Sequence, residues 1–255
     1  MERASVYDAE DGAFHEDVIT QRINHLLQQN PHDAYAHLFL GDLQASRDAY
    51  QEASALYAQA IAYDPTLAHG YYSLGVIYDK SGAPHKALEM YEQAVQHADS
   101  SLLYWNNLAG QYFRLQNYSK AIATYEQTLK RDGDFLLPYF DMAACFRVLG
   151  QFEQARQYQQ QGVARLDTPQ IAAQEKNQQP WYFNLGEQHI TLDTLPRKQC
   201  YAYRSLGATL QALHRSAEAA QYERKPCALH SVDMEAIQTW VQLEALSMDR
   251  VPTKS

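Results

Sequence analysis

A period of about 34 residues runs through the first two thirds of this 255-residue chain. Small residues recur at that interval at two places in each period. They are Gly41, Gly75, Ala109 and Ala143 at the first place, and Ala53, Ala87, Ala121 and Ala155 at the second. A period of this length predicts one supersecondary element that is repeated along the chain, because such an element buries its apolar side only against its neighbour.

The residues within each period resemble the tetratricopeptide repeat. The mark of that repeat is an aromatic residue, a Leu followed by a small residue, a second aromatic residue, and later an Ala and another aromatic. One period shows the mark in Tyr71, Leu74, Gly75, Tyr78, Ala87 and Tyr91, and the next in Trp105, Leu108, Ala109, Tyr112, Ala121 and Tyr125. The resemblance implies an all-α fold, a right-handed α-α superhelix (solenoid) of helix pairs. The small residues are expected where the two helices of a pair cross closely.

The phase of the repeat divides the chain. An acidic arm and one half-repeat helix are expected in residues 1–33, followed by four repeats at 34–67, 68–101, 102–135 and 136–169. In the fourth repeat the late aromatic Tyr158 comes one residue early, which indicates a slipped or rotated helix. Residues 170–255 are expected to form a less regular helical segment, with about one further repeat at 200–230 and a capping helix at 231–247. Strands are not expected, because no stretch alternates Val, Ile or Thr with polar residues between turn signals.

In tetratricopeptide repeat proteins the first helix of each repeat lines a concave groove, so the resemblance implies a binding surface made of side chains between the packing positions. These side chains are mostly aromatic and apolar, which suits an amphipathic helix or an extended apolar peptide. Carried over to this chain, they are Tyr35, Leu38, Asp42, His69, Tyr72, Val76, Asp79, Leu103, Asn106, Phe113, Leu137, Phe140 and Arg147.

Two specialised grooves of the family are not expected. A carboxylate clamp needs Lys, Asn and Arg at set positions, and only Asn107 fits. An asparagine ladder needs Asn along the whole groove, whereas Asn106 and Asn107 are isolated. Large apolar patches are rarely left bare, so the groove aromatics have two alternative uses. They could pack on the chain's own capping helix or pair in a homodimer.

The residue pattern does not indicate catalysis, a metal or a cofactor. The ten histidines show no metal-ligand spacing, and the nucleophile and phosphate-loop motifs are absent from the sequence. Cys200 with His189 or His214 could form a nucleophile and base, but closeness in sequence says nothing about geometry. Cys145 is expected to be a buried apolar residue. Cys200 and Cys227 could pair only in an exported protein, so they are expected to be free thiols. The chain is therefore expected not to be an enzyme.

Charge and hydropathy narrow the range of partners. The net charge is −9, and neither the arm, the repeats nor the C-terminal segment has a basic surplus. Nucleic acid is therefore an unsuitable partner, since its binding needs a basic face. No run of about 18 apolar residues and no apolar leader is present, so a cytoplasmic location is expected, although a trimmed leader or anchor would leave the same sequence.

Three functional readings follow from these features. In the first, the chain is a protein-protein interaction scaffold or adaptor that holds an apolar or amphipathic peptide segment of another protein. In the second, it is a regulatory or substrate-recruiting module of a larger enzyme or assembly. In the third, residues 170–255 form a functional domain of their own, which the repeats present. The irregular phase after residue 168 motivates the third reading.

Overall fold

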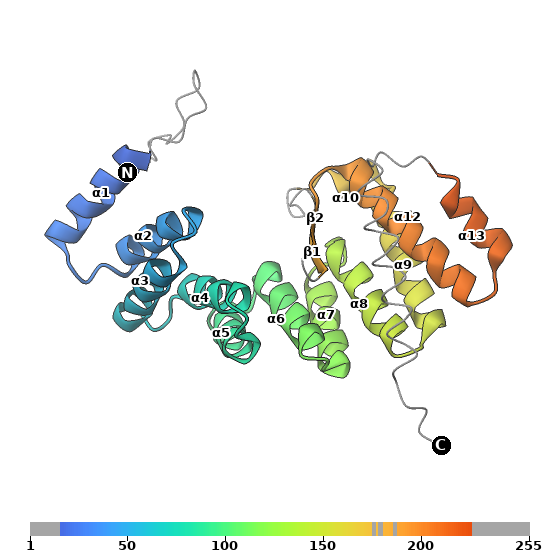
Figure 1. Cartoon of the computed structure of the whole chain (residues 1–255), viewed down its shortest axis with the longest axis horizontal. Helices are drawn as coiled ribbons and strands as arrows, with labels where there is room; N and C mark the ends of the chain where they lie inside the picture. Colours follow the sequence, from blue (N-terminus) through green and yellow to red (C-terminus); the bar gives the residue numbers. More distant parts are fainter. Residues whose placement is uncertain (1–15, 175–176, 178–180, 186–187, 226–255) are drawn as a thin grey trace. The chain divides into compact units, whose positions relative to one another are not determined.

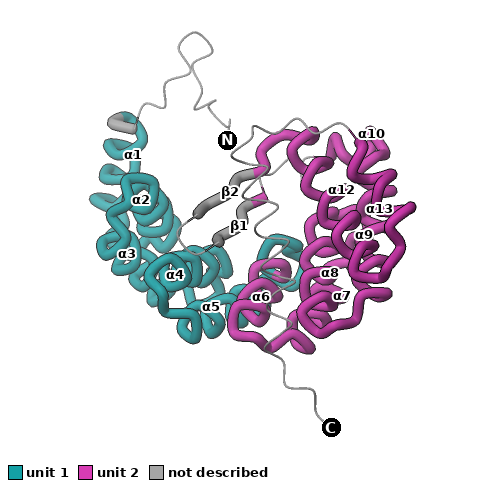
Figure 2. Tube along the Cα trace, turned by 45° about the vertical axis from the view of Figure 1, so that its right-hand side comes forward, with its two compact units in different colours: residues 1–104 teal, residues 105–255 magenta. Residues whose placement is uncertain are grey.

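The computed structural model describes residues 16–174, 177, 181–185 and 188–225. The acidic N-terminal arm and the capping helix predicted at 231–247 lie outside the described residues. The chain divides into two compact units, unit 1 over residues 1–104 and unit 2 over residues 105–255 (Figure 2). Within the described part, no helix combines the length and the apolar character that crossing a membrane requires.

Unit 1 consists of antiparallel helix pairs that follow the predicted repeats (Figure 1). Its helices are α1 (Glu16–Gln29), α2 (Ala34–Ser46), α3 (Tyr50–Tyr63), α4 (Ala68–Lys80) and α5 (Pro84–His97). The boundary between the units falls inside the next helix, α6 (Leu102–Arg114). The first helices of the first three predicted repeats are therefore α2, α4 and α6, and α3 and α5 are second helices.

Unit 2 continues with helix pairs and then departs from the pattern. Its further elements are α7 (Tyr118–Arg131), α8 (Leu137–Val148), α9 (Phe152–Leu166), α10 (Pro169–Ala172), β1 (Trp181–Leu185), β2 (Gln188–Leu192), α12 (Leu195–Ala212) and α13 (Ser216–Glu223). The helical fold agrees with the prediction from sequence. The two strands do not.

The turn between the helices of each pair repeats the same backbone geometry. One residue there has a left-handed conformation, and a backbone N–H just after it donates to a carbonyl five residues back, which closes the last helical turn. The left-handed residues are Asp48, Gly82, Gln116, Gly150 and His214. The first four follow the period of the repeat, whereas the fifth comes almost two periods after the fourth.

The crossing of each helix pair depends on small residues that face the second helix. A Cβ atom added at Gly41 would lie 2.6 Å from the ring of Tyr57, and one added at Gly75 would lie 2.8 Å from the ring of Tyr91. Both rings are buried, so neither has free space to move into. The aromatic residue sixteen positions after each glycine therefore fills the space that the missing side chain leaves.

A fifth helix pair, α12 and α13, carries the repeat pattern with a delay. Gly207 and Ala219 occupy the two small-residue places that Ala143 and Ala155 hold in the fourth pair, but they follow after almost two periods instead of one. Gly207 faces Glu223, sixteen residues further on, as Gly75 faces Tyr91. The chain therefore has an insertion of slightly less than one period before its fifth pair.

The inserted segment contains an antiparallel β-hairpin in which Trp181 is opposite Leu192. The prediction that the chain has no strands was wrong here. Tyr182, Leu185 and Gly186 resemble the start of a repeat, which led the prediction away from the β-hairpin pattern in the same residues. Two short runs rich in aromatic and β-branched residues, separated by a Gly-containing pair, are typical of a hairpin.

The fourth pair keeps its register, and the slip that the position of Tyr158 indicated does not occur. Ala155 and Gln159 of α9 are both fully buried at the usual packing positions. Gln159 stands where the other repeats have an aromatic ring, and its Nε2 donates to Ser205 Oγ of α12 at 2.8 Å. Tyr158 stacks on Phe146 instead. A polar contact to the fifth pair thus replaces an aromatic contact within the fourth.

Asn177 anchors the inserted segment to the loop between α7 and α8. Its Nδ2 donates to the carbonyl oxygens of Asp134 and Ile171, both at 2.8 Å, and its Oδ1 accepts from the backbone N–H of Leu136 at 3.0 Å. The buried Lys198 of α12 donates from Nζ to the carbonyl oxygen of Asn177 at 2.7 Å. Burial lowers the pKa of Lys198 to about 8.

The close crossing predicts a steric cost at Gly75. Gly75→Ala is expected to lower the free energy of unfolding by about 1–3 kcal/mol, because the new methyl group must displace the buried Tyr91 ring. Gly110→Ala is the matched control, since its Cβ would lie 3.7 Å from the nearest side-chain atom, Tyr125 Oη. Chemical denaturation of both variants provides the comparison. An equal or higher stability of Gly75→Ala would contradict the packing account.

The role of Asn177 predicts a large loss of stability on its removal. Asn177→Ala leaves one buried N–H and two carbonyl oxygens without their side-chain partner, which is expected to cost about 2–3 kcal/mol. The exposed Gln170 of α10 offers a control, because Gln170→Ala is expected to change stability by less than about 0.5 kcal/mol. Thermal and denaturant unfolding of the full chain measure both. A neutral Asn177→Ala would show that the anchor is dispensable.

Candidate functional site

The residues predicted to line a binding groove fall into both compact units. Those of unit 1 come from α2, α4 and the first turn of α6, and those of unit 2 come from α6 and α8. The two groups have different surroundings. In unit 1 most of the side chains are exposed or half-buried, whereas in unit 2 several are buried under other parts of the chain.

On α2 the accessible side is offset by one residue from the prediction. Tyr35 is 57% exposed, but Leu38 is only 3% exposed and packs in a core cluster with Leu67 and Leu74. Phe39, which was not predicted, is 54% exposed. Tyr35 and Phe39 are four residues apart and therefore share one helix face. The spacing of four residues from Tyr35 could have indicated Phe39, and not Leu38, as the second accessible residue of α2.

A group of four side chains joins the first helices of unit 1, and we call it the Tyr72 cluster: Asp42, His69, Tyr72 and Tyr104. His69 lies between two oxygens, with Nε2 3.8 Å from Asp42 Oδ2 and Nδ1 3.3 Å from the Tyr104 hydroxyl. Tyr72 and Tyr104 stack with their ring centroids 4.8 Å apart. The cluster therefore connects α2, α4 and α6 through polar and aromatic contacts. Tyr104 was not among the predicted residues.

Asp42 is partly exposed and has a fixed orientation. The Tyr57 hydroxyl of α3 donates to Asp42 Oδ1 at 2.9 Å, and burial together with the nearby carboxylate raises the pKa of Tyr57. Burial likewise raises the pKa of Tyr72 to about 12. The phenol rings of the cluster thus stay neutral at ordinary pH. The cluster presents one carboxylate beside neutral aromatic rings.

The remaining predicted residues of unit 1 surround this cluster. Val76 and Asp79 of α4 are half-buried, and Leu103 of α6 is 49% exposed. In unit 2, Asn106 is buried, while Phe113 and Leu137 are half-buried. Phe113 packs edge-on against Tyr118. The side chains that offer apolar surface to solvent are therefore mainly in unit 1.

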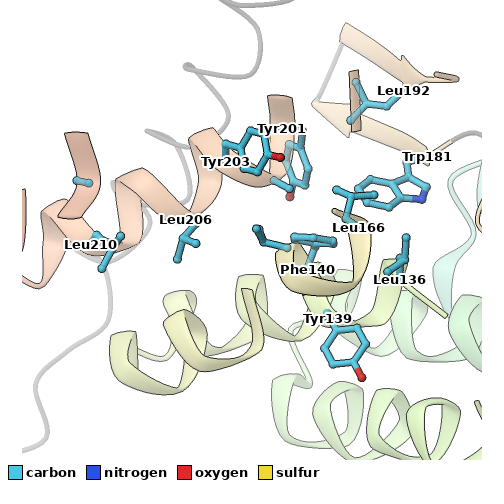
Figure 3. Close-up of a cluster of buried hydrophobic side chains, with 13 residues drawn as sticks. Leu136, Tyr139, Phe140, Leu166, Trp181, Leu192, Tyr201, Tyr203, Leu206 and Leu210 are labelled. Atoms are coloured by element: carbon cyan, nitrogen blue, oxygen red, sulfur yellow. The ribbon is translucent and has the colours of Figure 1, made fainter. Parts of the chain in front are cut away.

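At α8 the chain covers its own predicted groove residues. Phe140 is 1% exposed, and its ring lies 5.2 Å from the ring of Trp181 and 6.1 Å from that of Tyr201 (Figure 3). Arg147 is 3% exposed and donates to Ser205 Oγ of α12 at 2.7 Å. Phe140 and Arg147 are therefore core residues of unit 2, because the hairpin and α12 occupy the side on which a partner was expected. Phe140 thus packs on the hairpin and on α12, whereas the predicted capping helix, on which groove aromatics could pack, lies outside the described residues.

The core of unit 2 runs across the predicted domain boundary at residue 169. Leu136, Phe140 and Leu166 lie before it, and Trp181 and Leu206 lie after it, in one buried cluster (Figure 3). A separate functional domain starting at residue 170 would need a core of its own. The described part of residues 170–255 shares its core with α8 and α9.

The cysteines differ in state. Cys145 is a fully buried free thiol, as predicted, and burial raises its pKa. Cys200 is disulfide-bonded, so the prediction of a free thiol at that position was wrong. Cys227 lies outside the described residues. Among the described residues, no three His, Cys, Asp or Glu side chains gather closely enough to hold a metal ion.

Asp141 of α8 is a half-buried residue whose carboxyl group lies beneath the surface. Burial raises its pKa from 3.8 to about 7, and a hydrogen bond from Tyr125 acts in the opposite direction. Between these two pH values the folded state holds a proton that the unfolded chain releases. The contribution of Asp141 to stability is therefore largest at low pH and is lost as the pH rises toward 7.

Asp141→Asn is expected to remove this pH dependence, because the amide keeps an oxygen that can accept from Tyr125 but carries no charge. The variant should gain stability relative to the wild type as the pH rises from about 4 to 7, by at most about 1.4 kcal/mol per pH unit. Urea unfolding of both proteins across this range measures the difference. A difference that stays constant with pH would contradict the raised pKa.

Comparisons with known proteins agree with the geometry. Two family models described as tetratricopeptide repeat match residues 34–100 and 72–135. No curated protein matches the sequence significantly. Similar solved structures include a crystal structure of MamA, with a TM-score of 0.60 and 15% identity, covering 76% of this chain and 90% of that chain.

Two further solved structures share the fold. YrrB, described as a TPR protein with an unusual peptide-binding site, has a TM-score of 0.59 and 14% identity and covers 91% of this chain and 100% of its own. The APC/C hetero-tetramer Cut9-Hcn1 has a TM-score of 0.62 and 14% identity, covering 92% of this chain and 40% of that chain. At such identities the likeness shows the fold alone. The matched residues and the helix pairs together show tetratricopeptide repeats in residues 34–135 of this chain.

Proposed function

We propose that this chain is a protein-protein interaction scaffold that holds an apolar or amphipathic peptide segment of a partner protein on the first-helix surface of unit 1. The observation that carries the proposal is the exposure of Tyr35, Phe39 and Leu103 on first helices. Large apolar side chains that a fold leaves exposed together on one kind of element typically mark an interaction site. The proposal includes no catalytic role.

Unit 1 suits this role better than the α8 region of unit 2. Around α8, Trp181 and Tyr201 already pack on Phe140, and Ser205 already binds Arg147. A partner would have to displace buried aromatic contacts and a buried hydrogen bond there, whereas Tyr35 and Leu103 are accessible without any rearrangement. The inserted segment therefore restricts the proposed partner to the other first helices.

The comparisons are consistent with this function. YrrB has, by its description, a peptide-binding site on a similar fold. The second reading, a regulatory or substrate-recruiting module, remains an alternative, because this chain spans 40% of the similar Cut9-Hcn1 chain. The proposed partner is a protein and not a nucleic acid. The disulfide at Cys200 argues against the expected cytoplasmic location, because disulfides persist mainly in oxidising compartments. A second copy of this chain is the alternative partner.

The test is a pull-down from cell extract that compares the wild type with a Tyr35→Ala, Leu103→Ala variant. Both side chains are largely exposed, so the variant should fold normally and lose its specific partner by a factor of about 10 or more. Leu149→Ala with Leu195→Ala is the control, because these residues are exposed outside the predicted surface. If all three versions recover every protein equally, the proposal is wrong. If the bait recovers the copy of this chain that the extract contains, the result favours a homodimer.

A further inference from the structure

We propose that the Tyr72 cluster is the subsite for one arginine side chain of the partner segment. This inference rests on the proposed function and deepens it, because it names the side chain that the surface selects. The guanidinium would pair with the Asp42 carboxylate and lie against the stacked Tyr72 and Tyr104 rings. Three features of unit 1 support it: the accessibility of the carboxylate, the charge of the first helices, and the aromatic stack.

The carboxylate of Asp42 is oriented by a hydrogen bond and is also accessible to solvent. Its side chain is 39% exposed, and the Tyr57 hydroxyl fixes one oxygen at 2.9 Å. The other oxygen faces the imidazole of His69, at 3.8 Å, which is too long for a hydrogen bond. The site therefore offers a preoriented carboxylate with remaining capacity to accept hydrogen bonds, next to the exposed ring of His69.

The charges of the first helices are arranged to attract a cation. Helices α2 and α4 carry Asp42, Asp79 and Lys80 as their Asp, Glu, Lys and Arg residues. The ammonium group of Lys80 lies over the Tyr50 ring of α3, 5.1 Å from its centroid, and donates to the Tyr50 hydroxyl. Lys80, the single lysine of these two helices, thus contacts α3, which is the second helix of its repeat. Asp42 lies on α2 and contacts His69 of α4. Opposite charge on a partner segment would complement this surface.

The aromatic stack favours arginine over lysine. Tyr72 and Tyr104 stack at an interplanar angle of 25°, and Tyr104 also contacts His69 through its hydroxyl. A planar guanidinium can lie flat against a tyrosine ring and still direct two N–H groups at a carboxylate. A lysine ammonium is a compact, strongly hydrated charge that cannot do both. His69 contacts both Asp42 and Tyr104, so the carboxylate and the stacked rings belong to one cluster, which selects the guanidinium.

In the experiment, a random dodecamer phage library is selected for binding to the full chain. The enriched peptides are then synthesised, and their binding to the chain is measured by calorimetric titration. Peptides that share an arginine are expected. Replacing that arginine by citrulline, its neutral isostere, should weaken binding to the wild type about 10-fold. The same replacement should have less than about a 2-fold effect on Asp42→Asn, because the charge pair is already lost there. Lysine in place of arginine should also weaken wild-type binding.

The Asp42→Asn variant is expected to fold, since the new amide retains an oxygen that can accept from the Tyr57 hydroxyl, and circular dichroism checks this. Glu89→Gln on the exposed face of α5 is the control for the loss of one negative charge. Citrulline should weaken binding to Glu89→Gln as strongly as to the wild type.

Two results overturn the subsite and are distinguishable. If enriched peptides bind but lack a shared arginine, or if citrulline costs the same in the wild type and in Asp42→Asn, the subsite is wrong while peptide binding stands. If no peptide is enriched and none binds at the highest soluble concentration, both the subsite and the proposed function fail. An arginine effect confined to the wild type and the Glu89→Gln control establishes the subsite.

Discussion

The structure depends on the close crossing of two helices at a small residue, with a larger side chain sixteen residues later filling the space. Gly41 with Tyr57 and Gly75 with Tyr91 show the contact most directly. Each such pair buries one side internally and leaves another that only a neighbouring pair can cover. The pair must therefore be repeated. Where the array ends or is interrupted, some other segment must cover the side that a neighbouring pair would bury.

In unit 2 the interruption is the inserted segment between the fourth and fifth helix pairs. Its anchor, Asn177, satisfies backbone groups of the loop before α8, and its Trp181 packs on Phe140 and Tyr201. Most polar groups in a buried cluster need a hydrogen-bond partner, and Asn177 and Lys198 supply such partners. The same contacts that stabilise the fifth helix pair remove α8 from the accessible surface. Packing therefore determines that the α8 side chains Phe140 and Arg147 are not accessible.

Unit 1 shows the opposite arrangement. Its first helices keep Tyr35 and Phe39 in solvent and gather a carboxylate, an imidazole and two tyrosine rings at the Tyr72 cluster. These polar groups are partly exposed, so they contribute little to stability by themselves. Exposing large apolar side chains to water is unfavourable, and these side chains contribute little to the stability of the fold. Both facts are consistent with the proposed role of this surface in recognition.

The sequence by itself determined the repeat, the helix pairs and their turns, because small residues at a fixed interval and the left-handed turn positions are local requirements of each pair. It also contained the hairpin signal between Trp181 and Leu192, which the competing repeat pattern obscured. Only the tertiary structure decided which first-helix side chains remain accessible. Leu38, Phe140 and Arg147 have the spacing of surface residues, but they are buried by segments distant in sequence. Long-range packing determines that outcome, and a local pattern carries no information about it.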